Sequence, residues 1–192
     1  MPVLGIVASQ ISGHLFAPSG AYDSIATTTV GGGGAASITF SSIPSTYTHL
    51  QVRMLFRDTR SVVGDYASLQ FNSDTGSNYA LHLLSGTGAS VTSAGYASQT
   101  SIDISRVAGA SATTSVFGAA ILDILDYANT SKYTTTRSLG GVDNNGSGEI
   151  VLNSGLWMNT SAVSTITIKA QAGSANFSEY SSFALYGIKG GN

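Results

Sequence analysis

Cysteine is absent from this chain. That absence excludes a disulfide scaffold, a thiolate metal site and a cysteine nucleophile, and it makes folding independent of the redox compartment. Charge is scarce as well, since Asp, Glu, Lys and Arg make up 9% of the residues, against roughly a quarter in an ordinary soluble domain. The eight Lys and Arg are scattered and the formal net charge is −2, so we expect no nucleic-acid partner.

Long hydrophobic runs are missing too. The longest apolar stretch is far shorter than the roughly 20 residues that cross a bilayer. The N-terminal segment Met1–Ser9 is apolar but lacks the Lys or Arg that begins a secretory signal. We therefore expect no membrane partner, and synthesis in the cytoplasm of the cell that expresses the chain.

Small and hydroxyl-bearing residues take the place of charge. The 192 residues include 23 glycines and, counted together, 50 serines and threonines, which alternate with apolar residues in short runs. This pattern predicts a sheet protein with a hydroxyl-coated surface that is suited to packing beside other proteins. The length is that of one domain with a sizeable core, which we assign to residues 21–192.

The preceding segment, residues 1–20, shows no clean strand or helix period. We interpret it as an arm that packs on the domain or on a neighbouring subunit, because exposed apolar residues usually mark an interface. The alternative is a loosely ordered terminus. The arm interpretation predicts an assembly interface formed by the segment's apolar side chains: Val3, Leu4, Ile6, Val7, Ile11, Leu15 and Phe16.

From Tyr22 onward the pattern is strand, turn, strand. The clearest alternation places Leu50, Val52, Met54 and Phe56 on one face of a half-buried strand. Other strands are predicted at 23–30, 37–40, 66–72, 78–84, 102–107, 134–139, 150–157, 163–169 and 183–188. The apolar run 116–126 predicts a central strand covered on both faces, residues 85–98 predict a loop, and only 124–131 could make a helical turn.

Short strands separated by frequent turn signals are typical of a sandwich or barrel. We predict an all-β fold, an antiparallel two-sheet β-sandwich of jelly-roll type, with the N-terminal arm attached.

Motifs that carry chemistry are missing. The runs Gly31–Gly34 and Gly86–Gly88 meet neither nucleotide-binding fingerprint, and no G-x-S-x-G nucleophile elbow occurs. His14, His49 and His82 fall in three separate segments, so structural roles are favoured for them. We therefore predict no catalytic residue, no cofactor and no metal.

Two carboxylate patterns leave alternatives open. Asp123 and Asp126, with Glu149, could supply the paired acids of a glycan-degrading enzyme, but a buried ion pair with Arg106 or Arg137 is favoured for Asp123. The segment 143–149 alternates oxygen ligands as a calcium loop does. It also contains Asn-Gly, the strongest short hairpin signal, and we predict the hairpin.

Four aromatic residues could form a platform that stacks on sugar rings: Tyr133, Trp157, Tyr180 and Tyr186. The alternative is that Trp157 fills the core, as aromatic residues in sandwich strands mostly do, and we favour it.

Three stretches carry a family resemblance: Tyr22–Tyr47, Ile121–Trp157 and Tyr180–Gly190. Together they resemble small virion-associated proteins of tailed bacteriophages, particularly phages of aquatic and cyanobacterial hosts. The resemblance implies a β-sandwich without enzymatic activity that resides in the virion, contacts other capsid or tail proteins, and forms a homotrimer. A capsid decoration (cement) protein is the first expectation. A tail-fibre or tail-tip protein that binds host surface glycans is the alternative.

Overall fold

The computed structural model describes residues 21–171 and 175–190. In these ranges the chain forms twelve strands and no helix, and accordingly no helix long and apolar enough to cross a membrane occurs there. The strands are β1 (Tyr22–Thr29), β2 (Ser37–Phe40), β3 (His49–Phe56), β4 (Gly64–Phe71), β5 (Tyr79–Gly86), β6 (Val91–Gln99), β7 (Ile102–Ala108), β8 (Gly118–Leu125), β9 (Thr134–Asp143), β10 (Gly148–Trp157), β11 (Ile166–Ala170) and β12 (Ser182–Ile188).

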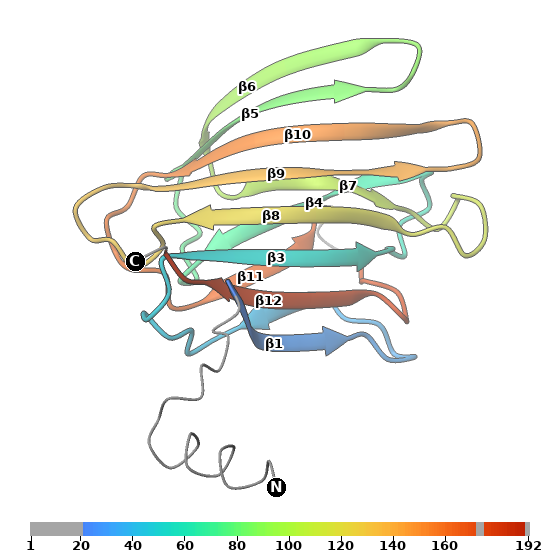
Figure 1. Ribbon diagram of the computed structural model, residues 1–192. Coiled ribbons are helices and arrows are strands. Elements are labelled where there is room, and N and C mark those ends of the chain that lie inside the picture. Colours follow the sequence, from blue (N-terminus) through green and yellow to red (C-terminus); the bar gives the residue numbers. More distant parts are fainter. Residues whose placement is uncertain (1–20, 172–174, 191–192) are drawn as a thin grey trace, which may run out of the picture.

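The strands form two antiparallel sheets packed face to face, as Figure 1 shows. The larger sheet has eight strands in the order β1-β12-β3-β8-β9-β10-β5-β6, and the smaller sheet has four in the order β2-β11-β4-β7. The predicted all-β, two-sheet sandwich is confirmed.

The strand order is that of a jelly roll with two added hairpins. Without β5–β6 and β9–β10, each sheet has four strands, β1-β12-β3-β8 and β2-β11-β4-β7. This pairing of early with late strands in both sheets is the double Greek key of the jelly-roll fold. The hairpins enter after β4 and after β8, and both extend the larger sheet beyond β8 (Figure 1).

The hydrophobic core lies between the sheets. The four inward residues predicted for β3 are buried, since Leu50, Val52, Met54 and Phe56 are each no more than 5% exposed. The bulkiest fully buried side chains are aromatic: Phe56, Phe71, Tyr79, Tyr127, Trp157, Phe177 and Phe183. Glycine at position 155 lets the sheets approach closely, because a Cβ there would lie 2.6 Å from Ile102 of β7.

Two strand predictions were wrong. Residues 85–98, predicted as a loop, contain the end of β5 and most of β6. β6 has no apolar alternation because nearly all its residues are exposed on both faces, so no core face had to be encoded. The run 116–126, predicted to be covered on both faces, is β8 with one exposed face that includes Ile121. The possible helical turn at 124–131 is the end of β8 and a hydrogen-bonded turn.

Two further predictions concern residues at the N-terminus. The arm at residues 1–20 lies outside the described residues, and so does the assembly interface assigned to it: Val3, Leu4, Ile6, Val7, Ile11, Leu15 and Phe16.

Candidate functional site

The outward surface of the eight-stranded sheet carries an unusual number of exposed apolar side chains. They come from five neighbouring strands and are 44–76% exposed: Ile121, Leu139, Leu152, Ile150, Leu84 and Val91, with Leu55 on β3 beyond them at 47%. We call these seven residues the outer apolar face.

Strand register places the central members side by side. Ile121 of β8 pairs with Leu139 of β9, Leu139 pairs with Leu152 of β10, and Leu152 pairs with Leu84 of β5. Neighbouring strands are about 4.8 Å apart, so these four side chains form a continuous row across the sheet. An apolar hollow of about 300 Å³ lies along this row, lined partly by Leu84, Leu139 and Leu152.

The next row contains small residues. Ala119 pairs with Gly141, Gly141 with Ile150, and Ile150 with Gly86. Because three of these four positions have little or no side chain, the surface is hollowed beside Ile150, and Phe117 contributes to the wall of that hollow. The outer apolar face therefore offers both ridges and a depression to a partner.

A polar row borders the outer apolar face. The Gln51 side chain donates a hydrogen bond to Asp123 Oδ1 at 2.9 Å, and Arg137 Nη2 lies 3.5 Å from Asp123 Oδ2. Arg53 donates to Gln51 and lies 5.0 Å from the ring centroid of Tyr186. Contiguous apolar surface with a polar rim is the usual appearance of a protein interaction site.

Sequence reasoning missed the outer apolar face, although a signal was present. Consecutive apolar residues, as in Leu83-Leu84 and Ile150-Val151-Leu152, place one member on each side of a strand. When one face of the sheet borders the core, one residue of each such pair is buried and its apolar neighbour is exposed on the opposite face.

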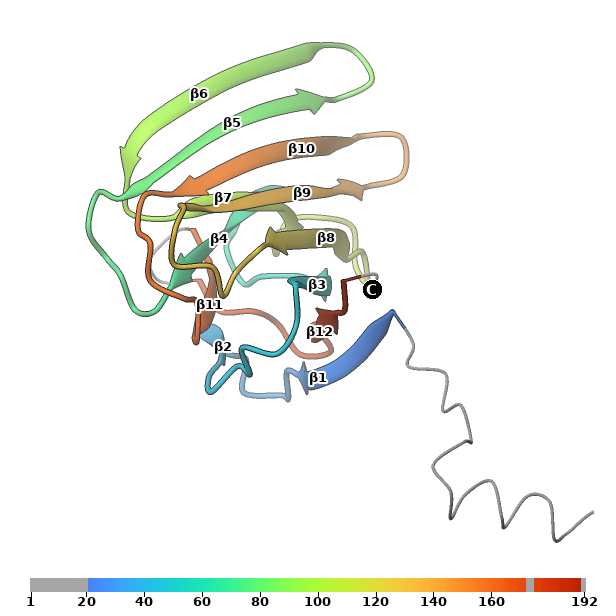
Figure 2. The same cartoon turned by 60° about the vertical axis from the view of Figure 1, so that its left-hand side comes forward.

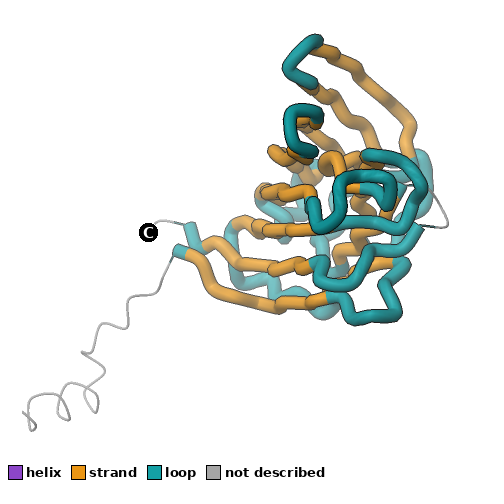
Figure 3. The backbone as a smooth tube through the Cα atoms, turned by 90° about the vertical axis from the view of Figure 1, so that its right-hand side faces the viewer, coloured by secondary structure: helices purple, strands orange, loops and turns teal. Residues whose placement is uncertain are grey.

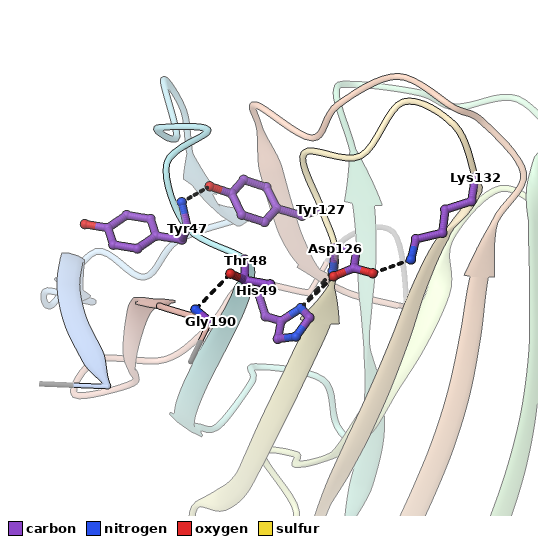
Figure 4. Close-up of polar contacts among 7 residues, drawn as sticks. All are labelled: Tyr47, Thr48, His49, Asp126, Tyr127, Lys132 and Gly190. Carbon is purple, nitrogen blue, oxygen red and sulfur yellow. Dashed lines mark hydrogen bonds and ion pairs between the residues drawn. The ribbon is translucent and has the colours of Figure 1, made fainter. Parts of the chain in front are cut away.

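The end of the sheet that holds His49 is a structural junction, shown in Figure 4. The backbone N–H of Asp126 donates to His49 Nδ1 at 2.9 Å, and Lys132 donates to the Asp126 carboxylate. This hydrogen bond from Lys132 lowers the pKa of Asp126. His49 is thus hydrogen-bonded, and its ring holds the start of the β8–β9 connection.

The same junction joins Gly190, which follows β12, to the β2–β3 connection (Figure 4). The Tyr127 hydroxyl donates to the Pro44 carbonyl and accepts the N–H of Tyr47, and the N–H of Gly190 donates to Thr48 Oγ1 at 2.8 Å. These contacts fix loops at one end of the sandwich.

The four aromatic residues that could have formed a sugar platform do not come together. Trp157 is 1% exposed, packs against Phe71 and Tyr79, and donates its indole N–H to Asp74 at 2.7 Å, so it belongs to the core as we favoured. Tyr186 stacks with Arg53 on the outward surface, whereas Tyr133 and Tyr180 lie in the β8–β9 and β11–β12 connections.

The candidate paired acids are separated as well. Asp123 is on the outward side of β8, and its ion pair is with Arg137 rather than Arg106. Glu149 is on the inward side of β10, where Arg106 binds it at 2.9 Å. The predicted ion pair of Asp123 is therefore present, with Arg137 as the partner. It is not buried as predicted, because the Asp123 carboxyl is partly exposed.

The segment 143–149 forms the predicted hairpin between β9 and β10. Asn145 and Gly146 have φ values of 56° and 92°, as both central residues of a type I′ turn require. The Asn144 N–H donates to the Ser147 carbonyl at 2.6 Å and closes the turn. Across the part of the chain that the structure describes, no three His, Asp or Glu side chains gather as a metal site.

Comparisons with protein-family models, with curated proteins and with solved structures returned no match to this chain.

Proposed function

We propose that this protein is a structural subunit of a bacteriophage virion, without enzymatic activity, and that it decorates the capsid. The observation that carries the proposal is the outer apolar face on a jelly-roll domain. Jelly rolls recur among viral capsid proteins, and an exposed row formed by Ile121, Leu139, Leu152 and Leu84 is suited to a permanent protein contact.

The chemistry of this surface supports tight packing. Covering an apolar side chain is favourable by about 25 cal/mol per Å², and none of the seven residues of the outer apolar face carries a charge whose desolvation would oppose it. The depression beside Ile150 would accept a projecting side chain of the partner. In this proposal the partner is another virion protein, and copies of the chain associate as a closed trimer.

The placement of the subunit is tested with purified phage particles. Mass spectrometry of mature particles should detect the protein, in far more copies for a capsid decoration than for a tail fibre or tail tip. Absence of the protein from mature particles would overturn the proposal. A low copy number would instead favour the tail, where binding of host glycans is the alternative role.

The attachment surface is tested by one charged substitution and a matched control. Leu139→Asp places a carboxylate in the centre of the outer apolar face, so the variant should no longer bind to particles that lack the protein. Thr135→Asp introduces the same residue on the same side of β9, outside that face, and should bind normally. Equal binding of both variants would contradict an attachment role for the outer apolar face.

The oligomeric state is measured on the free chain by light scattering coupled to size exclusion. A mass of three chains is expected. A monomer at micromolar concentration would contradict the trimer without affecting the attachment test.

A further inference from the structure

A second surface lies on the opposite side of the large sheet. The hairpin β5–β6 extends beyond the edge strand β7 of the small sheet, and Figures 1 and 2 show it arching away from the rest of the sandwich. Figure 3 shows the same overhang from the side. The inward face of the hairpin is therefore not fully covered, and a groove of about 430 Å³ lies between it and residues of β4, β7 and β10. We call it the inner groove.

One wall of the inner groove is a fixed polar network. The Tyr66 hydroxyl donates to Glu149 Oε1 at 3.2 Å, and Arg106 Nε lies 2.9 Å from Glu149 Oε2. The Arg106 guanidinium also lies 4.8 Å from the centroid of the Tyr66 ring. Burial, followed by the charge of Glu149, raises the pKa of Tyr66 to about 12, so its hydroxyl remains a donor.

A second polar pair lines the same groove. The side-chain amide of Gln171 donates to Asp103 Oδ1 at 2.8 Å. That bond uses one N–H of the amide and one oxygen of the carboxylate, so the Gln171 carbonyl oxygen and the second Asp103 oxygen can still bind a ligand. Both planar groups are oriented before any ligand arrives, which lowers the entropic cost of binding.

The hairpin supplies the apolar and hydroxyl side of the groove. Leu81 and Leu83 of β5 form part of its floor, and Thr92 and Tyr96 of β6 project from the same side of the hairpin. Tyr96 is 46% exposed, unlike the aromatic residues of the core, so part of its ring is open to a ligand. An exposed aromatic ring beside oriented carboxylate and amide groups matches a pyranose, which has an apolar C–H face and a rim of hydroxyls.

The charges in the groove restrict the class of ligand. The charged residues that line it, Asp103 and Glu149, are both acidic, and Arg106 compensates only Glu149. A phosphate or an acidic sugar would be repelled by the remaining carboxylate. A lipid chain would cover the Gln171 carbonyl oxygen and the second Asp103 oxygen without offering them a hydrogen-bond donor.

We propose that the inner groove binds a neutral oligosaccharide, with Tyr96 stacking on a sugar ring and the Asp103–Gln171 pair hydrogen-bonding to its hydroxyls. The groove lies on the side of the sheet opposite to the outer apolar face. Sugar binding therefore leaves the attachment surface free, and it stands even if attachment to a particle fails.

The proposal is tested by titrating the full chain with defined oligosaccharides and monitoring amide shifts by NMR. The probes are neutral tetrasaccharides of glucose, mannose, galactose and xylose, together with a sialylated oligosaccharide and a heparin tetrasaccharide. At least one neutral probe should shift resonances of β5, β6 and β7, and the two anionic probes should bind more weakly. No binding of any neutral probe at millimolar concentration, or preferential binding of an anionic one, would overturn the proposal.

The residues are tested with matched variants. Tyr96→Ala should weaken binding about tenfold, the factor expected for the loss of one stacked ring. Tyr133→Ala is the control, because Tyr133 is 49% exposed but lies outside the groove, and its affinity should equal that of the unmodified chain. Asp103→Ala should also weaken binding, and thermal melting checks that each variant is folded. Unchanged affinity in both groove variants would contradict the assignment of the site.

Discussion

The two inserted hairpins differ sharply in how they relate to the jelly-roll core. β10 buries its inward residues as completely as a jelly-roll strand does: Val151, Asn153 and Trp157 are at most 1% exposed. In β6, by contrast, nearly every residue is exposed on both sides. The difference follows from position, because β9 and β10 lie against β7 whereas β6 is the outermost strand of the large sheet.

This contrast separates stability from recognition. β9–β10 covers β7, and Asn153 links the two sheets by donating to the Ile104 carbonyl at 2.7 Å. The hairpin β5–β6 adds surface on both of its sides, part of the outer apolar face on one and part of the inner groove on the other. Substitutions of the inward residues of β10 should therefore alter folding, and substitutions of the exposed residues of β6 should alter binding.

The largest effect is expected for Trp157→Ala in β10. Removing this buried indole should lower the free energy of unfolding by about 3–5 kcal/mol, because it leaves a cavity beside Phe71 and removes one of the hydrogen bonds to Asp74. Leu152→Ala, on the exposed side of the same strand, should change it by at most about 0.5 kcal/mol. Urea denaturation measures both, and similar losses in the two variants would contradict the assignment of β10 to the core.

The next effect concerns pH and lies in the jelly-roll part. Asp58 is fully buried, its Oδ1 accepts the Arg60 N–H at 3.1 Å, and its Oδ2 has no hydrogen-bond partner among the residues described. Burial raises the pKa of Asp58 from 3.8 to about 6, and the neighbouring Asp65 contributes in the same direction. The folded state therefore holds this proton more tightly than the unfolded chain does.

The sign of the pH dependence follows from that shift. The stabilisation by the Asp58 proton is complete below pH 3.8 and is lost as the pH rises through about 6. A shift of this size corresponds to about 3 kcal/mol. Asp58→Asn keeps the shape without the ionisation, so its advantage over the unmodified chain should grow by about 2–3 kcal/mol between pH 4 and pH 8. Parallel stability–pH curves for the two proteins would contradict the buried proton.

Hydrogen exchange should sharpen the comparison between inner and outermost strands. The β6 amides that pair with β5 should exchange on the order of 100-fold faster than those of β3, because an exposed edge hairpin opens without breaking the core. β3 lies in the middle of the sheet and buries Leu50 and Val52. Equal protection of β6 and β3 would show that the hairpin unfolds only with the whole domain.

The smallest effect compares the turns of the two hairpins. Gly146 and Gly88 have φ values of 92° and 85°, and a Cβ would meet no neighbour at either position. Alanine at each is thus strained by about 1 kcal/mol through its backbone alone. Gly146→Ala should lower global stability by that amount, whereas Gly88→Ala should lower it less, because the β5–β6 end opens locally. A larger loss for Gly88→Ala would reverse this ranking of the hairpins.

The sequence predicted strands well where one face meets the core. The alternation of Leu50, Val52, Met54 and Phe56 records such a face, and the Asn145-Gly146 turn was recognised because a type I′ turn needs positive φ at both residues. β6 was missed because a strand that is exposed on both faces needs no alternation of apolar and polar residues. The inner groove was missed because Tyr66, Tyr96, Asp103 and Glu149 come from four strands with no common motif.

Composition and alternation thus decided the all-β class, the two-sheet sandwich and the low-charge, hydroxyl-rich surface, because burial of every second residue is a local property of a strand. Strand order decided which side chains lie together on each exposed face of the large sheet. Only the insertion of both hairpins beside β8 aligns Ile121, Leu139, Leu152 and Leu84 on one side and opens a groove on the other. These surfaces depend on pairing between residues far apart in the chain, which local patterns do not encode.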